Sequence, residues 1–543
     1  VGHAVRATYM YSGMADVAAL TGDASYLKAV DAIWQSVVGK KLYITGGIGA
    51  SGRGEAFGGE YELPNMTAYN ETCAAIGNDY WNHRLFLLHG DAKYIDVMER
   101  TLYNGLISGV SLDGKSFFYP NPLESNGQHE RSPWFGVACC PGNITRFLAS
   151  VPGYVYALQG DTIFVNLFAK GTADLTLQDG RKVTLSQDTR YPWDGAVRLT
   201  VAPERPGSFA LKVRIPGWAR NEVVPSDLYR FADADAEPAG IRVNGTQVAV
   251  TPTNGYVEVR RAWQRGDVVQ LDLPMPVRRV LANDKVEADR GRAALQRGPI
   301  VYALEGPDNR NGKVRNIVLP DDAPLTSEFR PDLLRGVQVI KGRAFSLAYD
   351  AQGRVDKTEQ DLVAIPYATW ANRGRGQMIV WVATADKVAR PTPWPTVGMT
   401  STVTTSATGG AITASPSRRS PTAMNDGEDP QASDDPSSYF DWWPRRGTSE
   451  WVEYAFARPA TVSEVEVYWF DDTGHGEVRV PASWRLLYKD GEAWKPVDAR
   501  EPYRVEKNGY NKVTFIPVST GALRLELTMQ PEWSAGIQEW TVR

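Results

Sequence analysis

Sulfur and imidazole ligands are scarce in this chain, whose 543 residues include three cysteines and five histidines. So few thiols cannot supply the paired framework of a disulfide-stapled domain. The 63 acidic residues nearly balance the 59 basic ones, so the chain lacks the basic footprint of a nucleic-acid-binding protein. No apolar run approaches the length of a membrane span. Aromatic residues are abundant instead, with 17 Trp and 24 Tyr, and such flat amphipathic rings suit the faces of sugars.

The few cysteines are concentrated in one stretch. Cys73 lies in Glu71-Thr72-Cys73, and Cys139 and Cys140 are adjacent. A disulfide fits poorly, because the number of cysteines is odd and a bridge between neighbours closes a strained ring. One interpretation is three buried thiols that pack as small apolar residues. The other is a metal site, because three thiols and the Glu71 carboxylate make a complete tetrahedral ligand set for Zn²⁺, although no standard zinc-finger spacing is present.

The apolar pattern changes several times along the chain, which predicts a multidomain α+β protein. Residues 1–153 read as helical and contain an echo, because Thr21-Gly22-Asp23 recurs as His89-Gly90-Asp91. In each copy one helix ends at Gly, Asp caps the next helix, and a Tyr packs one turn later. Repeated hairpins of this kind build solenoids or closed toroids, so we expect residues 1–153 to be the C-terminal part of an (α/α)6 toroid. Val1 runs into a helical pattern without an initiating Met, and we therefore expect the chain to begin inside that domain.

From residue 154 the apolar period changes to two, with turns such as Asn244-Gly245 between the runs, as in antiparallel β-sandwiches. We expect one sandwich over 154–285 and a second over 286–390. The next stretch is rich in Ser, Thr, Pro and Gly and is predicted to be a linker over 391–414, in which one short strand can be embedded. Residues 415–543 alternate again and are predicted to form a β jelly roll.

A nucleophile and a general acid can be picked out in the first domain. Glu55 lies in the Gly-rich segment between Gly46 and Gly59, and Pro141, directly after the cysteine pair, suits the first position of a helix. A thiol at a helix N-terminus that is also bound to zinc is held as thiolate near neutral pH. Ordinary glycoside hydrolysis uses two carboxylates, and such a thiolate could replace the one that acts as nucleophile, with Glu55 as the acid/base.

Several segments resemble glycoside hydrolase family 127, the β-L-arabinofuranosidases. The likeness extends to about residue 385 and rests on segments that occur in the family's order: Gly2-His3-Ala4-Val5-Arg6, the loop from Gly46 to Glu55, Leu63-Pro64-Asn65, Glu71-Thr72-Cys73, Phe118-Tyr119-Pro120-Asn121-Pro122, Cys139-Cys140-Pro141, Ala364-Ile365-Pro366-Tyr367 and Trp370-Ala371-Asn372-Arg373-Gly374.

This resemblance implies that Cys139 is the nucleophile and Glu55 the acid/base. It implies a Zn²⁺ site formed by Glu71, Cys73, Cys139 and Cys140, and a sugar subsite lined by His3, Tyr119 and Glu71. Family members carry helices before the segment that matches Gly2-His3. We therefore expect the pocket of this chain to be open on one side.

The last part of the chain resembles a discoidin-like (coagulation factor type C) jelly roll, a fold that often binds carbohydrate. The matching segments are Ala423-Met424-Asn425-Asp426-Gly427, Trp451-Val452-Glu453-Tyr454, Pro481-Ala482-Ser483-Trp484 and Gly536-Ile537-Gln538-Glu539-Trp540. Trp442 and Trp443 are the candidates for stacking on a sugar, and we expect one to be exposed and the other packed. Asn425-Asp426-Gly427 is either a structural Ca²⁺ site or a plain Asp-Gly turn.

Together these patterns predict a retaining exo-glycosidase, β-L-arabinofuranosidase-like, that acts on plant-glycan sugars with a zinc-bound thiolate. The expected partner is a glycan, a homodimer stays open, and the expected location is periplasmic or secreted. The alternative is a non-catalytic glycan-binding protein, because four protein ligands are typical of structural zinc. A third interpretation, a lyase or hydrolase of uronic-acid sugars on a similar toroid, leaves the thiolate cluster without an obvious role.

Overall fold

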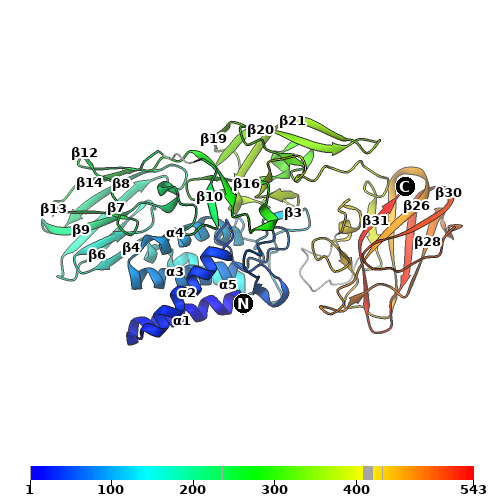
Figure 1. Cartoon of the computed structure of the whole chain (residues 1–543), viewed down its shortest axis with the longest axis horizontal. Helices are drawn as coiled ribbons and strands as arrows, with labels where there is room; N and C mark the ends of the chain where they lie inside the picture. Colours follow the sequence, from blue (N-terminus) through cyan, green and yellow to red (C-terminus); the bar gives the residue numbers. More distant parts are fainter. Residues whose placement is uncertain (1, 234–236, 408–419, 431) are drawn as a thin grey trace. The chain divides into compact units, whose positions relative to one another are not determined.

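The structure is a computed structural model that describes residues 2–233, 237–407, 420–430 and 432–543 (Figure 1). The chain divides into two compact units. Unit 1 comprises Val1–Ser125, Arg131–Ser346 and Thr358–Arg390, and unit 2 comprises Asn126–Glu130, Leu347–Lys357 and Pro391–Arg543. The end of the predicted linker, 408–414, and the predicted start of the last module at 415 lie outside the described residues.

The helical part of unit 1 confirms the caps of the sequence echo. Its helices are α1 (Ala4–Thr21), α2 (Ala24–Lys40), α3 (Thr72–His89), α4 (Ala92–Thr101) and α5 (Cys139–Ser150). Gly22 and Gly90 end α1 and α3 with left-handed φ angles of 69° and 66°, and the next helices are capped by Asp23 and Asp91. The packing of the Tyr is confirmed only in the second copy, because Tyr94 is buried whereas Tyr26 is 40% exposed. Among the described residues, no helix is long and apolar enough to cross a membrane.

Helix α3 packs against α1, α4 and α5. The starts of α1, α3 and α5 thereby lie in one region. The approach of α1 to α3 depends on Gly77, since a Cβ atom at this position would lie 2.3 Å from the hydroxyl oxygen of Thr8. Strand β1 (Gly2–His3), directly before α1, pairs with β2 (Ala56–Phe57), and His3 lies opposite Ala56. This pairing places His3 beside Glu55.

Two sheets follow the helices, as the change of period predicts. The six-stranded sheet has the order β12 (Thr246–Val248), β11 (Gly240–Val243), β14 (Asp267–Asp272), β8 (Ala196–Pro203), β7 (Lys182–Thr189) and β6 (Gly171–Thr176). The four-stranded sheet has the order β13 (Tyr256–Trp263), β9 (Gly207–Arg214), β5 (Thr162–Val165) and β4 (Tyr156–Gln159). Strands β5 and β9 run parallel, so the expectation of a purely antiparallel sandwich is wrong at this pair.

The strands expected to form a second sandwich are instead hydrogen-bonded into one eleven-stranded sheet. Its order is β10 (Tyr229–Phe231), β15 (Val277–Ala282), β16 (Arg292–Arg297), β23 (Val382–Ala383), β18 (Ile317–Val318), β20 (Val337–Tyr349), β21 (Val355–Pro366), β17 (Ile300–Glu305), β22 (Gln377–Ile379) and β3 (Glu124–Asn126), with β19 (Leu325–Arg330) paired to β20. Strands β3, β10 and β15 come from segments that the sequence assigned to other domains. Alternation locates strands, but it does not name their partners.

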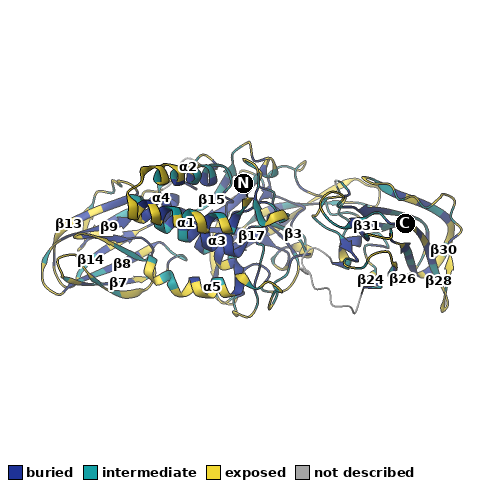
Figure 2. Cartoon of the chain, turned by 90° about the horizontal axis from the view of Figure 1, so that it is seen from below, coloured by how far each residue is buried: buried dark blue, intermediate teal, exposed yellow. Residues whose placement is uncertain are grey.

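Unit 2 contains an eight-stranded sheet around its own core. The order is β25 (Phe440–Asp441), β31 (Ser534–Val542), β26 (Ser449–Phe470), β30 (Tyr510–Thr528), β28 (Ser483–Asp490) and β29 (Ala493–Pro496), with β24 (Thr402–Thr405) on β26 and β27 (Val478–Arg479) on β31. Figure 2 shows buried residues along β26 and β31, and this core includes Trp442, Trp469 and Trp540. Because β24 lies within 391–414, the stretch predicted as a linker contributes a strand to this sheet.

Candidate active site

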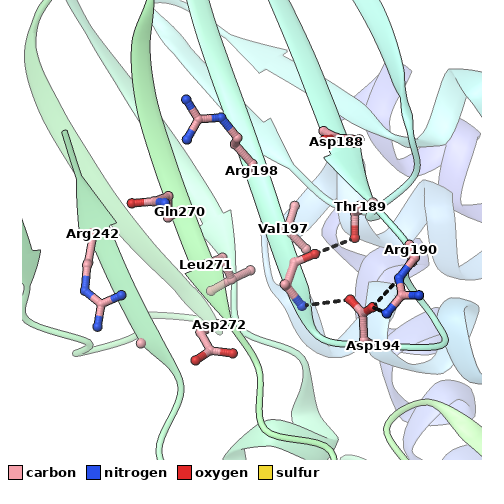
Figure 3. Close-up of a pocket in the computed structure, with 12 residues that line it drawn as sticks. Asp188, Thr189, Arg190, Asp194, Val197, Arg198, Arg242, Gln270, Leu271 and Asp272 are labelled. Atoms are coloured by element: carbon pink, nitrogen blue, oxygen red, sulfur yellow. Dashed lines mark hydrogen bonds and ion pairs between the residues drawn. The ribbon is translucent and has the colours of Figure 1, made fainter. Parts of the chain in front are cut away.

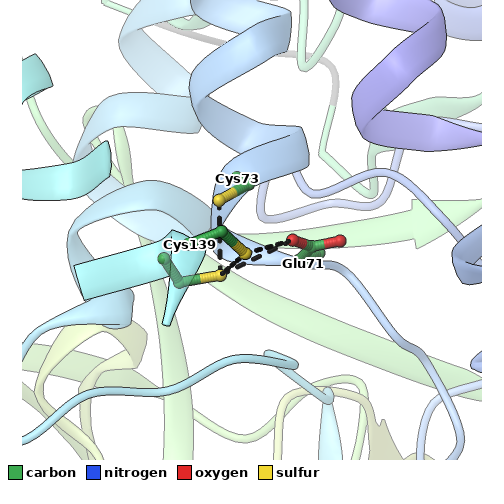
Figure 4. A group of neighbouring side chains, drawn as sticks. Glu71, Cys73 and Cys139 are labelled. Carbon is green, nitrogen blue, oxygen red and sulfur yellow. Dashed lines mark hydrogen bonds between the residues drawn. The ribbon is translucent and has the colours of Figure 1, made fainter. Parts of the chain in front are cut away.

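The starts of two helices bring the cysteines together (Figure 4). Glu71 precedes α3 as its N-cap residue, and Cys73 is the second residue of that helix. Cys139 and Cys140 are the first two residues of α5. The helix therefore begins two residues before Pro141, which we expected to be its first residue. Proline is tolerated there because the N–H groups of the first turn have no intrahelical partner.

The four donor atoms have the spacing of a tetrahedral metal site. The Sγ atom of Cys140 lies 3.4 Å from that of Cys73 and 3.8 Å from that of Cys139. Glu71 Oε1 lies 3.5 Å from Cys139 Sγ and 3.6 Å from Cys140 Sγ. Zn–S bonds of about 2.3 Å and Zn–O bonds of about 2.0 Å would place two sulfurs about 3.8 Å apart and sulfur and oxygen about 3.5 Å apart. The residues present therefore fit a bound metal ion.

Most of the ligand residues are buried, and one oxygen of the Glu71 carboxyl has no hydrogen-bond donor among the described residues. Glu71, Cys73 and Cys140 are at most 2% exposed, whereas Cys139 is exposed. The second carboxylate oxygen of Glu71, Oε2, is buried and accepts no hydrogen bond from the described residues. Burial, and then the charge of Cys139, raises the pKa of the Glu71 carboxyl to about 8. A buried carboxyl without partners either stays protonated or is paired with a cation, and a metal ion would supply that partner.

The thiol of Cys139 differs from its two neighbours. Hydrogen bonds from the Cys140 and Cys73 thiols lower the pKa of Cys139 to about 2, and Tyr119 and Glu71 act in the same direction. Burial raises the pKa of Cys140, and the hydrogen bond with Cys139 raises that of Cys73. Cys139 is thus the thiol most readily held as thiolate, and it is also the one that solvent reaches.

Glu55 lies beside this cluster, in a strained position. Its backbone φ of 50° is left-handed, a conformation that costs free energy for a residue other than glycine and is concentrated at functional sites. One carboxylate oxygen lies 2.7 Å from His3 Nε2, and the other accepts a hydrogen bond of 3.0 Å from the Tyr69 hydroxyl. Ligand atoms of His3, Glu55 and Glu71 all lie within 4.8 Å of one another. The glutamate predicted from the Gly-rich loop therefore adjoins the cysteine cluster.

Two tyrosines lie at the site, one beside Cys139 and one beside Glu55. The hydroxyl of Tyr119 lies 3.1 Å from Cys139 Sγ, and the rings of Tyr119 and Tyr69 lie 6.1 Å apart. Burial raises the pKa of both hydroxyls, so they remain donors near neutral pH. Sequence reasoning found Tyr119 but missed Tyr69, because an isolated Tyr two residues before Glu71 belongs to no motif.

The site residues expected in unit 2 need a correction. Trp442 is 2% exposed and packs in the core, so it has no ring face for a sugar. Trp443 is half-buried, not exposed as expected for the partner of a packed Trp442, and its indole N–H donates to Glu477 at 2.7 Å. In the Asn425-Asp426-Gly427 segment, the amide of Asn425 donates to the backbone oxygens of Gly398 and Ser401.

Comparison with known proteins identifies the family of unit 1. Residues 1–153 match the family model described as "Beta-L-arabinofuranosidase, GH127 catalytic domain". Residues 162–275 match the middle domain of the same family, and residues 277–383 its C-terminal domain. The chain therefore belongs to glycoside hydrolase family 127.

The similar proteins are longer than the part of them that this chain matches. It is 35% identical over 410 residues to a non-reducing end β-L-arabinofuranosidase of Bifidobacterium longum, covering 70% of this chain and 59% of that protein. A solved GH127 β-arabinofuranosidase is 54% identical with a TM-score of 0.71, covering 72% of this chain and 61% of that one. A GH127 β-L-arabinofuranosidase from Geobacillus stearothermophilus T6 is 44% identical with a TM-score of 0.65, covering 70% and 60%. The chain thus spans about 60% of the length of these relatives.

Proposed function

We propose that this chain carries the catalytic machinery of a retaining exo-glycosidase that removes β-L-arabinofuranose units from glycans. The observation that carries the proposal is the exposed Cys139 thiol, which belongs to an otherwise buried three-thiol cluster and has its pKa lowered there. Family membership supports the same substrate class, since relatives are described as β-L-arabinofuranosidases.

Glu71, Cys73, Cys139 and Cys140 would hold the metal ion, which we take to be Zn²⁺ because three thiolates and one carboxylate suit it. Bound there, zinc would keep the Cys139 sulfur deprotonated at neutral pH and limit its basicity. Four protein ligands also suit a structural zinc, which keeps the non-catalytic glycan-binding protein as the alternative. The exposure of Cys139 favours catalysis over that alternative, because a purely structural ligand has no need of access to solvent.

The reaction would proceed by two displacements. In the first, the Cys139 sulfur forms a bond to the anomeric carbon while the glycosidic C–O bond breaks, and Glu55 gives its proton to the departing oxygen. In the second, Glu55 takes a proton from water, whose oxygen displaces Cys139 and releases the sugar with its original configuration. His3 and Tyr69 orient the Glu55 carboxylate through their contacts with its two oxygens. His3, Tyr119 and Glu71 would line the sugar subsite.

The test is hydrolysis of an aryl β-L-arabinofuranoside by the zinc-loaded chain. Cys139→Ser should abolish turnover while the protein stays folded, because a hydroxyl is a much poorer nucleophile than a thiolate. Glu55→Gln should slow substrates with poor leaving groups most, by roughly 10²–10⁴-fold. Glu60→Gln is the matched control, since Glu60 lies nearby in sequence but pairs with Lys40 at the surface. If Cys139→Ser retains activity within tenfold of the wild type, Cys139 is not the nucleophile and the glycan-binding alternative gains.

For unit 2 we propose an accessory glycan-binding module with a structural Ca²⁺ near Asn425-Asp426-Gly427. Glu539 supports the ion, because its carboxyl is 2% exposed and its Oε2 accepts no hydrogen bond from the described residues. Burial, and then the charge of Asp426, raises the pKa of Glu539, so a cation would relieve both effects. Trp443 remains the candidate for sugar stacking. A periplasmic or secreted location stays a further proposal, because it is where a plant glycan would be met, and the homodimer stays a proposal as well.

A further inference from the structure

A hollow of about 520 Å³ lies on the six-stranded sheet of unit 1, and no residue of the cysteine cluster lines it (Figure 3). The register of the sheet aligns polar side chains along one side of the hollow. Arg242 on β11 pairs with Gln270 on β14, Gln270 with Arg198 on β8, and Arg198 with Asp188 on β7. These side chains therefore stand in one row across four strands and point to the same face.

The neighbouring row leaves the space. Gly240, Asp272 and Ala196 pair across the same strands, two residues further along each. Gly240 has no side chain, and a Cβ atom there would meet nothing nearer than the Asp272 Cβ at 3.9 Å. Gly240 and Ala196 thus leave open space on the two sides of Asp272.

Three charged side chains at this hollow have no protein partner among the described residues. Asp188 pairs with Lys170 at 3.2 Å, and Arg190 pairs with Asp194 at 2.7 Å. Arg198, Arg242 and Asp272 make no ion pair or side-chain hydrogen bond with the described residues. The hollow therefore offers two guanidinium forks and one carboxylate, with the Gln270 amide between the arginines.

This combination selects a class of ligand. A guanidinium fork matches a carboxylate bidentately, whereas Asp272 can only accept hydrogen bonds and so requires a donor such as a hydroxyl. Arg198 and Arg242 lie two strand spacings apart, or about 10 Å between Cα atoms, which their side chains can bridge toward one anion. No aromatic side chain lines the hollow, so it lacks the stacking platform that suits a neutral sugar. A doubly charged phosphate would be repelled by Asp272 more strongly than a singly charged carboxylate is.

We propose that this hollow binds a uronic-acid residue of an acidic glycan, with Arg198 and Arg242 on its carboxylate and Asp272 on its hydroxyls. The site is separate from the hydrolase site and does not depend on the proposed catalysis. Its role would be to hold an acidic polysaccharide while neutral side chains of that polysaccharide are cleaved elsewhere on the chain.

The test is calorimetric titration of the full chain with trigalacturonate, with a neutral galactan trisaccharide of equal length for comparison. We expect saturable binding of trigalacturonate that is at least tenfold tighter than that of the neutral sugar and weakens with salt. Arg198→Gln with Arg242→Gln should reduce affinity at least tenfold. Arg205→Gln with Arg265→Gln is the matched control, because it removes the same charge from exposed positions of the same region outside the hollow. Asp272→Ala should weaken the binding of trigalacturonate and of monomeric galacturonate relative to that of acetate, which has no hydroxyl for Asp272 to contact.

Four outcomes would overturn the proposal. They are absence of binding at 10 mM trigalacturonate, equal binding of the neutral trisaccharide, an equal loss of affinity in the control pair, and acetate binding as tight as that of galacturonate. Hydrolysis of the aryl arabinofuranoside by the Arg198 and Arg242 variants should remain unchanged. A failure of this inference is thereby distinguishable from a failure of the proposed catalytic function.

Discussion

Loading the metal-free protein with zinc should release about three protons per ion at pH 7. The number follows from the ionisation of the four donors before binding. Burial raises the pKa of Glu71 to about 8, so it is mostly protonated, and the raised pKa values of Cys73 and Cys140 keep those thiols protonated as well. Cys139, with its pKa lowered to about 2, is already a thiolate. Since zinc binds the deprotonated forms, three of the four donors must lose a proton.

Proton release makes the apparent zinc affinity steeply dependent on pH. With about three protons released, affinity should rise roughly 1,000-fold per pH unit between pH 5 and 7, and less steeply once the pH exceeds the pKa of Glu71. Calorimetry in buffers of different ionisation enthalpy measures the proton number directly. A competition titration with a chromophoric chelator at pH 6 and 7 measures the slope.

Two variants separate the contributions of individual ligands. Glu71→Gln should reduce the release to about two protons, because the amide cannot ionise. Cys139→Ser should give a release between two and three, because loss of the Cys139 charge lowers the pKa of Glu71. Glu60→Gln, on the exposed carboxylate that pairs with Lys40, should change nothing. Release of one proton or fewer by the wild-type chain would refute the reasoning. It would mean either that the buried thiols are ionised beforehand or that zinc does not engage all four residues.

Three further perturbations test the electrostatics of the fold. Burial raises the pKa of Asp289 to about 7, so the folded state binds this proton more tightly than the unfolded chain does, and stability should fall as pH rises from 4 to 7. Asp289→Asn should recover up to about 4 kcal/mol of unfolding free energy at pH 8. Denaturant titration measures this gain, with Asp321→Asn as the control. Arg214 is fully buried and pairs with Asp96 at 2.6 Å and with Glu99; Arg214→Met should cost about 3–5 kcal/mol, whereas Arg260→Met, which breaks an exposed pair with Asp161, should cost less than about 1 kcal/mol. Chelation of Ca²⁺ should lower the melting temperature of unit 2 in the wild type but not in Glu539→Gln, and equal shifts in both would remove Glu539 from the site.

The ligand cluster could be predicted from sequence because few residue types can form it. Only three thiols are present, and two of them are adjacent, so a site with three thiolate ligands had to include Cys139 and Cys140. Glu71 could be added because it lies two residues from Cys73. The starts of two helices were equally readable, since Asp23 and Asp91 cap α2 and α4 as their positions after Gly predict, whereas α5 begins two residues before the expected Pro141.

Strand partners and tertiary burial were not readable in this way. The alternation over 286–390 located strands, yet β3 and β10 joined their sheet from segments far away in the chain. Trp442 and Trp443 look equivalent as a dipeptide, and only the packing of unit 2 buries the first of them. A period of two tells which side of a strand is apolar, but it does not tell which sheet covers that side.

The Glu55 carboxylate shows most clearly what a sequence pattern omits. A Gly-rich loop indicated that the backbone there turns tightly, but the left-handed φ of Glu55 itself and its two supports become visible only in three dimensions. His3 reaches Glu55 because β1 pairs with β2, and Tyr69 reaches it from the segment before α3. Both contacts join positions that no local periodicity relates. An acid/base residue needs such supports from separate elements, because its reach toward the reacting atoms depends on how firmly its carboxylate is held.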